Sequence, residues 1–108
     1  HRQLSVHELD MTRLEQHPFG YYQPAADAAQ VAPSVLELML LPGLCFDTLG
    51  ARLGYGMGHI DRLLARAPQA YKIGVIAHEL VVQRLPQEAT DVSMDALATD
   101  QRVIVAQS

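Results

Sequence analysis

The stretch Val35-Leu36-Glu37-Leu38-Met39-Leu40-Leu41 decides the fold, because it is an apolar run of strand length bounded by Pro33 and Pro42. Nearly continuous apolarity is typical of a strand that is buried on both faces of a parallel sheet. The segment from Lys72 to Ala77 has a similar character and predicts a second strand. We therefore expect an open α/β sheet.

The residues between these two strands predict a loop followed by a helix. Glycines alternate at positions 54, 56 and 58, and the apolar side chains from Ile60 to Ala67 recur at i, i+3, i+4 and i+7, which places them on one helical face. Pro68 ends this helix. The order strand, loop, helix, strand is a βαβ unit, whose crossover is expected to be right-handed. Ligands of such sheets bind beyond the carboxyl ends of the strands, and the glycine loop lies on a connection that leaves one of those ends.

The outer segments predict shorter elements. We expect an edge strand within Arg2 to Glu8, a helical turn from Met11 to Gln16, and one turn of helix within Ala25 to Gln30, inside an irregular stretch rich in proline. Short strands are expected from Ala96 to Thr99 and from Arg102 to Val105. A length of 108 residues is enough for one small domain.

The composition argues against several function classes. The formal net charge is −4, and the eight Lys and Arg residues form no cluster, so a nucleic-acid or anionic-membrane surface is not expected. The sequence has neither an apolar stretch long enough to span a bilayer nor the early apolar run of a signal peptide. Cys45 is the one cysteine, and it fits a reducing compartment. We therefore expect a cytoplasmic protein.

The glycine loop admits two interpretations from its own residues. Alternating glycines let successive backbone N–H groups point inward as an anion nest, and the following helix adds free amides and a positive dipole end. The spacing matches neither a Walker A loop nor a dinucleotide fingerprint. A tight turn that requires glycine torsions explains the same pattern, so the loop alone does not separate a phosphate site from a turn.

The residues around the loop also carry paired interpretations. Arg52 suits a two-point phosphate clamp or a solvated side chain. Asp61 suits a magnesium ligand or an acid favoured at a helix N-terminus, and Asp91 suits a second magnesium-associated acid or a turn cap. His59 lies between the loop and Asp61 and suits a ligand contact or a surface position. The five histidines have no metal-binding spacing.

Several segments taken together resemble the 5-formyltetrahydrofolate cyclo-ligase (methenyltetrahydrofolate synthetase) family. The central match comprises Leu41-Pro42-Gly43-Leu44-Cys45-Phe46-Asp47, then Gly50, then Arg52-Leu53-Gly54-Tyr55-Gly56-Met57-Gly58-His59-Ile60-Asp61-Arg62-Leu63-Leu64. The flanking matches are Phe19-Gly20-Tyr21-Tyr22-Gln23-Pro24 upstream and Leu85-Pro86, Glu88, Asp91-Val92, Asp95 and Thr99 downstream. The resemblance extends from about Leu4 to Val105.

This resemblance implies an open three-layer Rossmann-like α/β sheet. Residues 1–108 would be the C-terminal part of a single cyclo-ligase-like domain, without the N-terminal half of the family fold. It also implies an enzyme that uses Mg²⁺ and ATP to convert a reduced folate, 5-formyltetrahydrofolate, to 5,10-methenyltetrahydrofolate. ATP would phosphorylate the formyl oxygen, and a folate nitrogen would then close the ring and expel phosphate.

The family's site residues carry over position by position. By resemblance, Arg52 and the loop Gly54-Tyr55-Gly56-Met57-Gly58 would bind the phosphates of ATP, and Asp61 and Asp91 would bind magnesium. His59 and Gln23 would face the folate. The resemblance assigns no catalytic residue.

The sequence departs from the family pattern on the folate side. His59-Ile60 replaces a tyrosine pair, and Ile60 loses the stacking area that an aromatic ring offers a flat pterin. Gln23 replaces a glutamate, Thr90 a frequent histidine, and Met57 a frequent glycine or lysine. These differences favour, as the alternative, a catalytically degenerate paralogue or fragment that retains the phosphate loop without folate chemistry. A structural or interaction domain with an inherited fold is the third hypothesis.

The start of the chain adds an expectation about assembly. The sequence begins at His1 rather than Met, and nothing in it matches the family's basic N-terminal segment. A domain cut in this way exposes a sheet edge, so self-association or binding of a partner fragment is expected.

Overall fold

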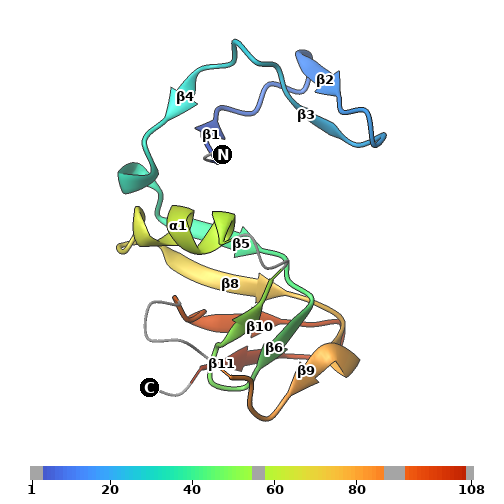
Figure 1. The fold of residues 1–108 in the computed structure, drawn as a ribbon, viewed down its shortest axis with the longest axis vertical. Helices are drawn as coiled ribbons and strands as arrows, with labels where there is room; N and C mark the ends of the chain where they lie inside the picture. The colour runs from blue at the N-terminus through green and yellow to red at the C-terminus, as the bar shows by residue number, and fades with distance from the viewer. Residues whose placement is uncertain (1–3, 55–57, 87–91, 107–108) are drawn as a thin grey trace.

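The chain folds into a mixed α/β body with an N-terminal arm, as seen in a computed structural model that describes residues 4–54, 58–86 and 92–106 (Figure 1). The arm comprises residues 4–32 and extends along the longest axis of the molecule, whose principal dimensions are 41 × 26 × 26 Å. The body contains the main sheet, a short helix and a smaller sheet.

The main sheet consists of β5 (Leu38–Leu41), β8 (Tyr71–Val75), β10 (Ala96–Ala98) and β11 (Val103–Val105), in the order β11-β10-β8-β5. Both β5 and β10 run parallel to β8, and β11 is antiparallel to β10. The structure thus confirms the predicted parallel strands and the short terminal strands. The first strand begins later than its apolar run, because the 3-10 helix η1 (Pro33–Val35) occupies the start of that run.

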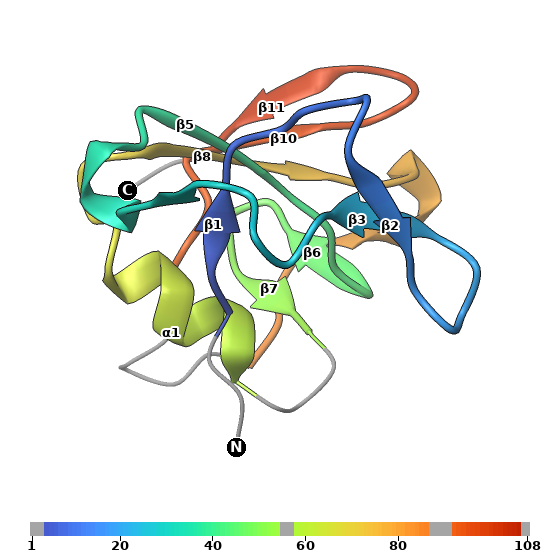
Figure 2. The same cartoon turned by 90° about the horizontal axis from the view of Figure 1, so that it is seen from above.

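One face of this sheet is covered by α1 (His59–Ala65) and by a smaller sheet (Figure 2). The smaller sheet has the order β7-β6-β9 and consists of β6 (Cys45–Asp47), β7 (Arg52–Leu53) and β9 (Val81–Val82), with the 3-10 helix η2 (His78–Leu80) before β9. The predicted loop between the two long strands therefore contains two short strands, β6 and β7. Phe46 pairs with Val81, so these strands depend on a partner distant in sequence.

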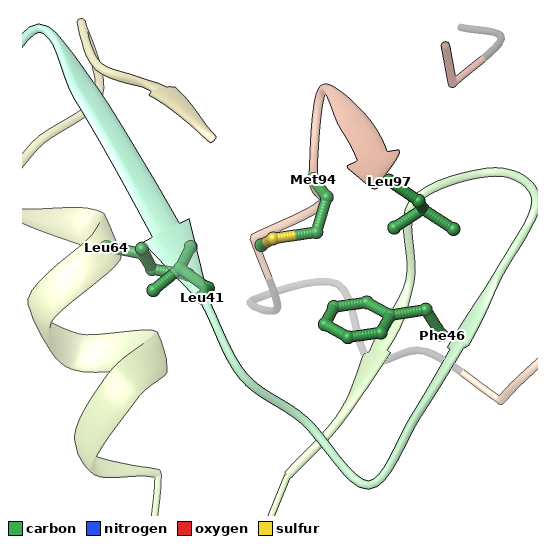
Figure 3. Close-up of a cluster of buried hydrophobic side chains, with 5 residues drawn as sticks. All are labelled: Leu41, Phe46, Leu64, Met94 and Leu97. Carbon is green, nitrogen blue, oxygen red and sulfur yellow. The ribbon is translucent and has the colours of Figure 1, made fainter. Parts of the chain in front are cut away.

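The core lies between the main sheet and this covering layer. Its buried side chains come from several elements, and Figure 3 shows the aromatic ring of Phe46 below Met94 and Leu97, with Leu41 meeting Leu64 beside them. The ring of Phe46 packs directly on Gly74, where an added Cβ would lie 2.5 Å from a ring carbon. Glycine at this position therefore provides the space that the ring fills.

A buried lysine connects α1 to the main sheet. The Nζ of Lys72 donates hydrogen bonds to the carbonyls of Ala67 at 2.7 Å and Ala70 at 2.9 Å, just after the end of α1. A cation is favourable at this negative end of a helix. The backbone N–H of Lys72 donates to the carboxylate of Asp95 at 2.8 Å.

The arm contains two strand pairs and corrects two predictions. β1 (Val6–His7) pairs antiparallel with β4 (Gln30–Val31), and β2 (Leu14–Gln16) forms a hairpin with β3 (Tyr22–Pro24). The edge strand predicted within residues 2–8 is confirmed. The helical turn predicted for residues 11–16 was wrong, because Asp10 stabilises a turn by accepting from the backbone N–H of Thr12 and the chain then enters β2. Residues 25–30 form a turn that leads into β4 rather than a helix.

Candidate functional site

The site begins at the turn between β6 and β7, which a buried carboxylate organises. Asp47 is 1% exposed, and its Oδ1 accepts hydrogen bonds from the backbone N–H groups of Leu49 and Ala51, both at 2.9 Å. Its Oδ2 accepts from the N–H of Leu85 at 2.8 Å. One side chain therefore joins the strand that leads into the glycine loop to the segment that leads toward Asp91.

Arg52 lies at the entrance to the glycine loop. Its Nε donates to the carbonyl of Pro42 at 2.6 Å, which fixes the direction of the side chain. The guanidinium then lies against Gly54, where an added Cβ would be 2.6 Å from a terminal nitrogen. Arg52 is half-buried. Its positive charge is therefore held in place beside Gly54, the first glycine of the loop.

The other end of the loop is Gly58, which directly precedes α1. Gly58 adopts a left-handed conformation with φ +72°, which glycine accepts without strain. The backbone N–H of Arg62 donates to the carbonyl of Gly58. The N–H groups that precede it in α1, those of residues 59–61, have no partner within the helix, as is usual at a helix start. Asp61 lies in the first turn of α1, as predicted, and is half-buried.

Arg62 is a site residue that the sequence analysis missed. The helical periodicity placed it on the face away from the core, and its side chain is indeed exposed. Its guanidinium nevertheless folds back over Gly58, where an added Cβ would lie 2.9 Å from a terminal nitrogen. Arg52 and Arg62 thus lie beside the first and last glycines of the loop.

Some predicted residues fall outside the described part of the chain. These are Tyr55, Gly56 and Met57 in the loop, and Glu88, Thr90 and Asp91 in the later segment. The proximity of Asp91 to Asp61 therefore stays a prediction. Among the described residues, no three His, Cys, Asp or Glu side chains form a group suited to a metal ion.

The two residues predicted to face the folate lie in different parts of the molecule. His59 is the first residue of α1 and is half-buried. Gln23 lies in β3 of the arm, paired with Glu15 and apart from α1 (Figure 1). The described chain therefore does not bring Gln23 to His59.

The β2–β3 hairpin carries an aromatic cluster, in a segment that was expected to have irregular structure. The ring of His17 stacks on Tyr21 with a centroid distance of 4.5 Å and an angle of 11°, and it contacts Phe19 at 4.9 Å. Phe19 is 86% exposed. The hairpin therefore exposes flat apolar surface.

Comparisons with known proteins agree with the resemblance seen in the sequence. A sequence model described as the 5-formyltetrahydrofolate cyclo-ligase family matches residues 1–100. A 5-formyltetrahydrofolate cyclo-ligase of Escherichia coli is 37% identical over 100 residues, covering 89% of this chain and 52% of that protein. One from Mycolicibacterium smegmatis is 39% identical over 71 residues, covering 65% of this chain and 37% of that protein.

A solved structure is similar over almost the whole chain. The NMR structure of Aquifex aeolicus 5,10-methenyltetrahydrofolate synthetase aligns with a TM-score of 0.82 and 33% identity, covering 98% of this chain and 54% of that one. The chain therefore spans about half the length of the Escherichia coli and Aquifex aeolicus relatives. In the described part of the chain, no helix has the length and apolar character needed to cross a bilayer.

Proposed function

The chain belongs to the 5-formyltetrahydrofolate cyclo-ligase family, and from this premise we propose that it supplies the magnesium–nucleotide side of an enzyme that converts 5-formyltetrahydrofolate to 5,10-methenyltetrahydrofolate. The observation that carries the proposal is the pair of guanidinium groups at the two ends of the glycine loop, beside Gly54 and Gly58. A soluble folate enzyme of the cytoplasm is part of the same proposal, supported by the single cysteine.

In the proposed reaction, the formyl oxygen of the folate accepts the terminal phosphoryl group of ATP, and ADP leaves. A folate N–H nitrogen then bonds to the formyl carbon and loses its proton to solvent, the bond from that carbon to the phosphorylated oxygen breaks, and phosphate is released. Phosphoryl transfer depends mainly on alignment and on neutralising negative charge. Two arginines at a glycine-rich loop provide both, because guanidinium groups bind phosphate oxygens in a fixed geometry.

The proposed roles follow from the positions of the side chains. Arg52 would orient the phosphates, because the carbonyl of Pro42 fixes its Nε and directs the terminal nitrogens to the loop. The amides of residues 59–61 would add donors at the helix start. Asp61 would bind Mg²⁺, which takes carboxylate oxygens together with phosphate oxygens, and Asp91 remains the proposed second ligand.

Titration calorimetry with Mg-ATP tests the nucleotide side of the proposal. We expect Arg62→Gln to weaken binding by about tenfold to a hundredfold, because a hydrogen bond to a charged group contributes about 1.5–3 kcal/mol. Arg66→Gln is the matched control, since Arg66 caps the opposite end of α1 and is exposed. Equal affinities for the two variants would contradict the assigned role of Arg62.

The absorbance of methenyltetrahydrofolate tests the folate side. With 5-formyltetrahydrofolate and Mg-ATP, we expect product only where both halves of the relatives' length are present. The replacement of a tyrosine pair by His59-Ile60 favours a second candidate function, a degenerate paralogue that binds nucleotide without converting folate. Binding of Mg-ATP without any methenyl absorbance would identify this second function.

A further inference from the structure

The turn between β6 and β7 is attached to a segment that lies far from it in the sequence. The carbonyl of Gly50 accepts a hydrogen bond from the backbone N–H of Met94 at 2.7 Å. Met94 is a core residue, 2% exposed, and it lies just before β10 of the main sheet. The turn is therefore joined to the main sheet at Gly50, in addition to its bond to Leu85 through Asp47.

Glycine at position 50 permits this contact in two ways. Its φ is +95°, a left-handed conformation that residues with a Cβ rarely adopt. An added Cβ would also lie 2.3 Å from the carbonyl oxygen of Met94 and 3.1 Å from its nitrogen. Both of these atoms belong to the backbone, so neither can rotate aside as the end of a flexible side chain would. A side chain at position 50 therefore moves the turn away from Met94.

Arg52 follows this turn directly, and its side chain is also fixed from the main sheet. Only the buried Ala51 stands between Gly50 and Arg52. The Nε of Arg52 donates at 2.6 Å to the carbonyl of Pro42, which is the residue after β5. The backbone before Arg52 is thus held at Met94 and its side chain at Pro42, and both of these residues adjoin strands of the main sheet.

We propose that Gly50 is a positioning residue of the nucleotide site, and that it acts through Arg52. The close contact with Met94 brings the Nε of Arg52 within reach of Pro42, and that bond directs the guanidinium to Gly54. An arginine held in this way loses little side-chain freedom when a phosphate binds, whereas a released arginine must be ordered at that moment. The inference rests on the proposed binding of Mg-ATP by Arg52 and adds the residue that keeps Arg52 in place.

Gly20 offers a matched control for the effect of torsion. Its φ is +99°, close to that of Gly50, but an added Cβ would meet nothing within 4 Å. It lies between β2 and β3, in the arm. Gly20→Ala and Gly50→Ala therefore impose a similar backbone strain, and only Gly50→Ala also presses on another segment of backbone.

Hydrogen exchange at the Nε–H of Arg52, followed by NMR, tests the positioning without any ligand. This proton forms the bond to Pro42, so its exchange rate reports whether the bond is intact. We expect Gly50→Ala to speed the exchange by roughly tenfold or more and Gly20→Ala to change it by less than about twofold. An unchanged rate in folded Gly50→Ala would overturn the proposal, whether or not the chain binds nucleotide.

Calorimetric titration with Mg-ATP tests the consequence for binding in a double-mutant cycle. Gly50→Ala should weaken binding roughly tenfold in the parent chain but less than about twofold in a chain that carries Arg52→Gln, because Gly50 acts through Arg52. A general loss of stability would weaken both backgrounds alike, and that result would overturn the proposal. Unchanged affinity of Arg52→Gln itself would instead refute the proposed phosphate role of Arg52, while the exchange rates still show whether Gly50 positions it.

Far-UV circular dichroism checks that each variant folds. If Gly50→Ala does not, Ala51→Gly takes its place, because it introduces no clash and only gives the backbone between Gly50 and Arg52 more freedom. We expect this milder change to speed exchange at the Nε–H of Arg52 by roughly threefold. In that case, an exchange rate equal to that of the parent chain would overturn the proposal.

Discussion

Replacing Asp47 by asparagine probes how the two segments of the candidate site are connected. The substitution keeps the shape of the side chain and leaves no cavity, but it exchanges one oxygen for an amide NH₂. Asparagine can keep an oxygen toward Leu49 and Ala51, where two N–H groups donate, and its NH₂ then faces the N–H of Leu85. Two donors face each other in that arrangement, and the reverse orientation loses two bonds instead of one.

The expected cost follows from these three contacts. Loss of one hydrogen bond to a charged group costs about 1.5–3 kcal/mol, and the two remaining bonds lose their charge assistance. Because the side chain is buried, water cannot easily replace the lost partner. We therefore expect Asp47→Asn to lower the free energy of unfolding by roughly 2–4 kcal/mol, a large fraction of the ~5–15 kcal/mol typical of a domain.

Urea unfolding followed by circular dichroism measures this change. With a slope of about 1–3 kcal/mol per molar urea, the midpoint should fall by roughly 0.7–4 M. Hydrogen exchange should show the largest loss of protection at the amide of Leu85, because the amides of Leu49 and Ala51 keep an acceptor. Asp47→Ala, which removes all three bonds, should cost more. A change below about 0.5 kcal/mol, or equal loss of protection at all three amides, would refute the reasoning.

Two further predictions concern packing and pH. Gly74→Ala should destabilise the chain by about 1–3 kcal/mol, because the new methyl group meets the buried ring of Phe46, and combining it with Phe46→Leu should cost less than the sum of the two changes in urea unfolding. The backbone N–H of His78 donates to Asp100 at 2.7 Å and lowers the pKa of that carboxyl. A lowered pKa means that this contact stabilises the fold above the usual titration range of aspartate and is lost as pH falls through the lowered value. The carboxyl carbon shift of Asp100 should therefore stay constant from neutral pH down to that usual range and change only in stronger acid, and a midpoint at or above the usual value would contradict this.

The elements that could be predicted from the sequence carry their own periodic pattern. β5, β8 and α1 show continuous or helical apolar spacing, so local residues suffice to place them. β6, β7 and β9 could not be predicted, because each has two or three residues and exists only through pairing: β7 pairs with β6, and β6 pairs with β9 between positions 46 and 81. In the arm, the residues from Met11 to Gln16 are compatible with a helix, and only the pairing with Tyr22–Pro24 selects a strand.

The candidate site likewise contains residues that the sequence could place and residues that it could not. The place of Asp61 in the first turn of α1 follows from the loop and helix pattern. The position of Arg62 over Gly58 could not be predicted, because it depends on the path of a long side chain rather than on the helical face. The role of Asp47 could not be predicted either, because one of its partners, Leu85, is 38 positions away.

Because Lys72 is buried, the reactivity of its amine reports whether the protein is folded. Lys72 is the chain's one lysine, it is 4% exposed, and its ammonium group is occupied by two carbonyls. An amine-acylating reagent should therefore spare Lys72 in the folded protein and modify it in an unfolded molecule. The mass of the product then distinguishes folded from unfolded molecules without any dye, tag or introduced reporter.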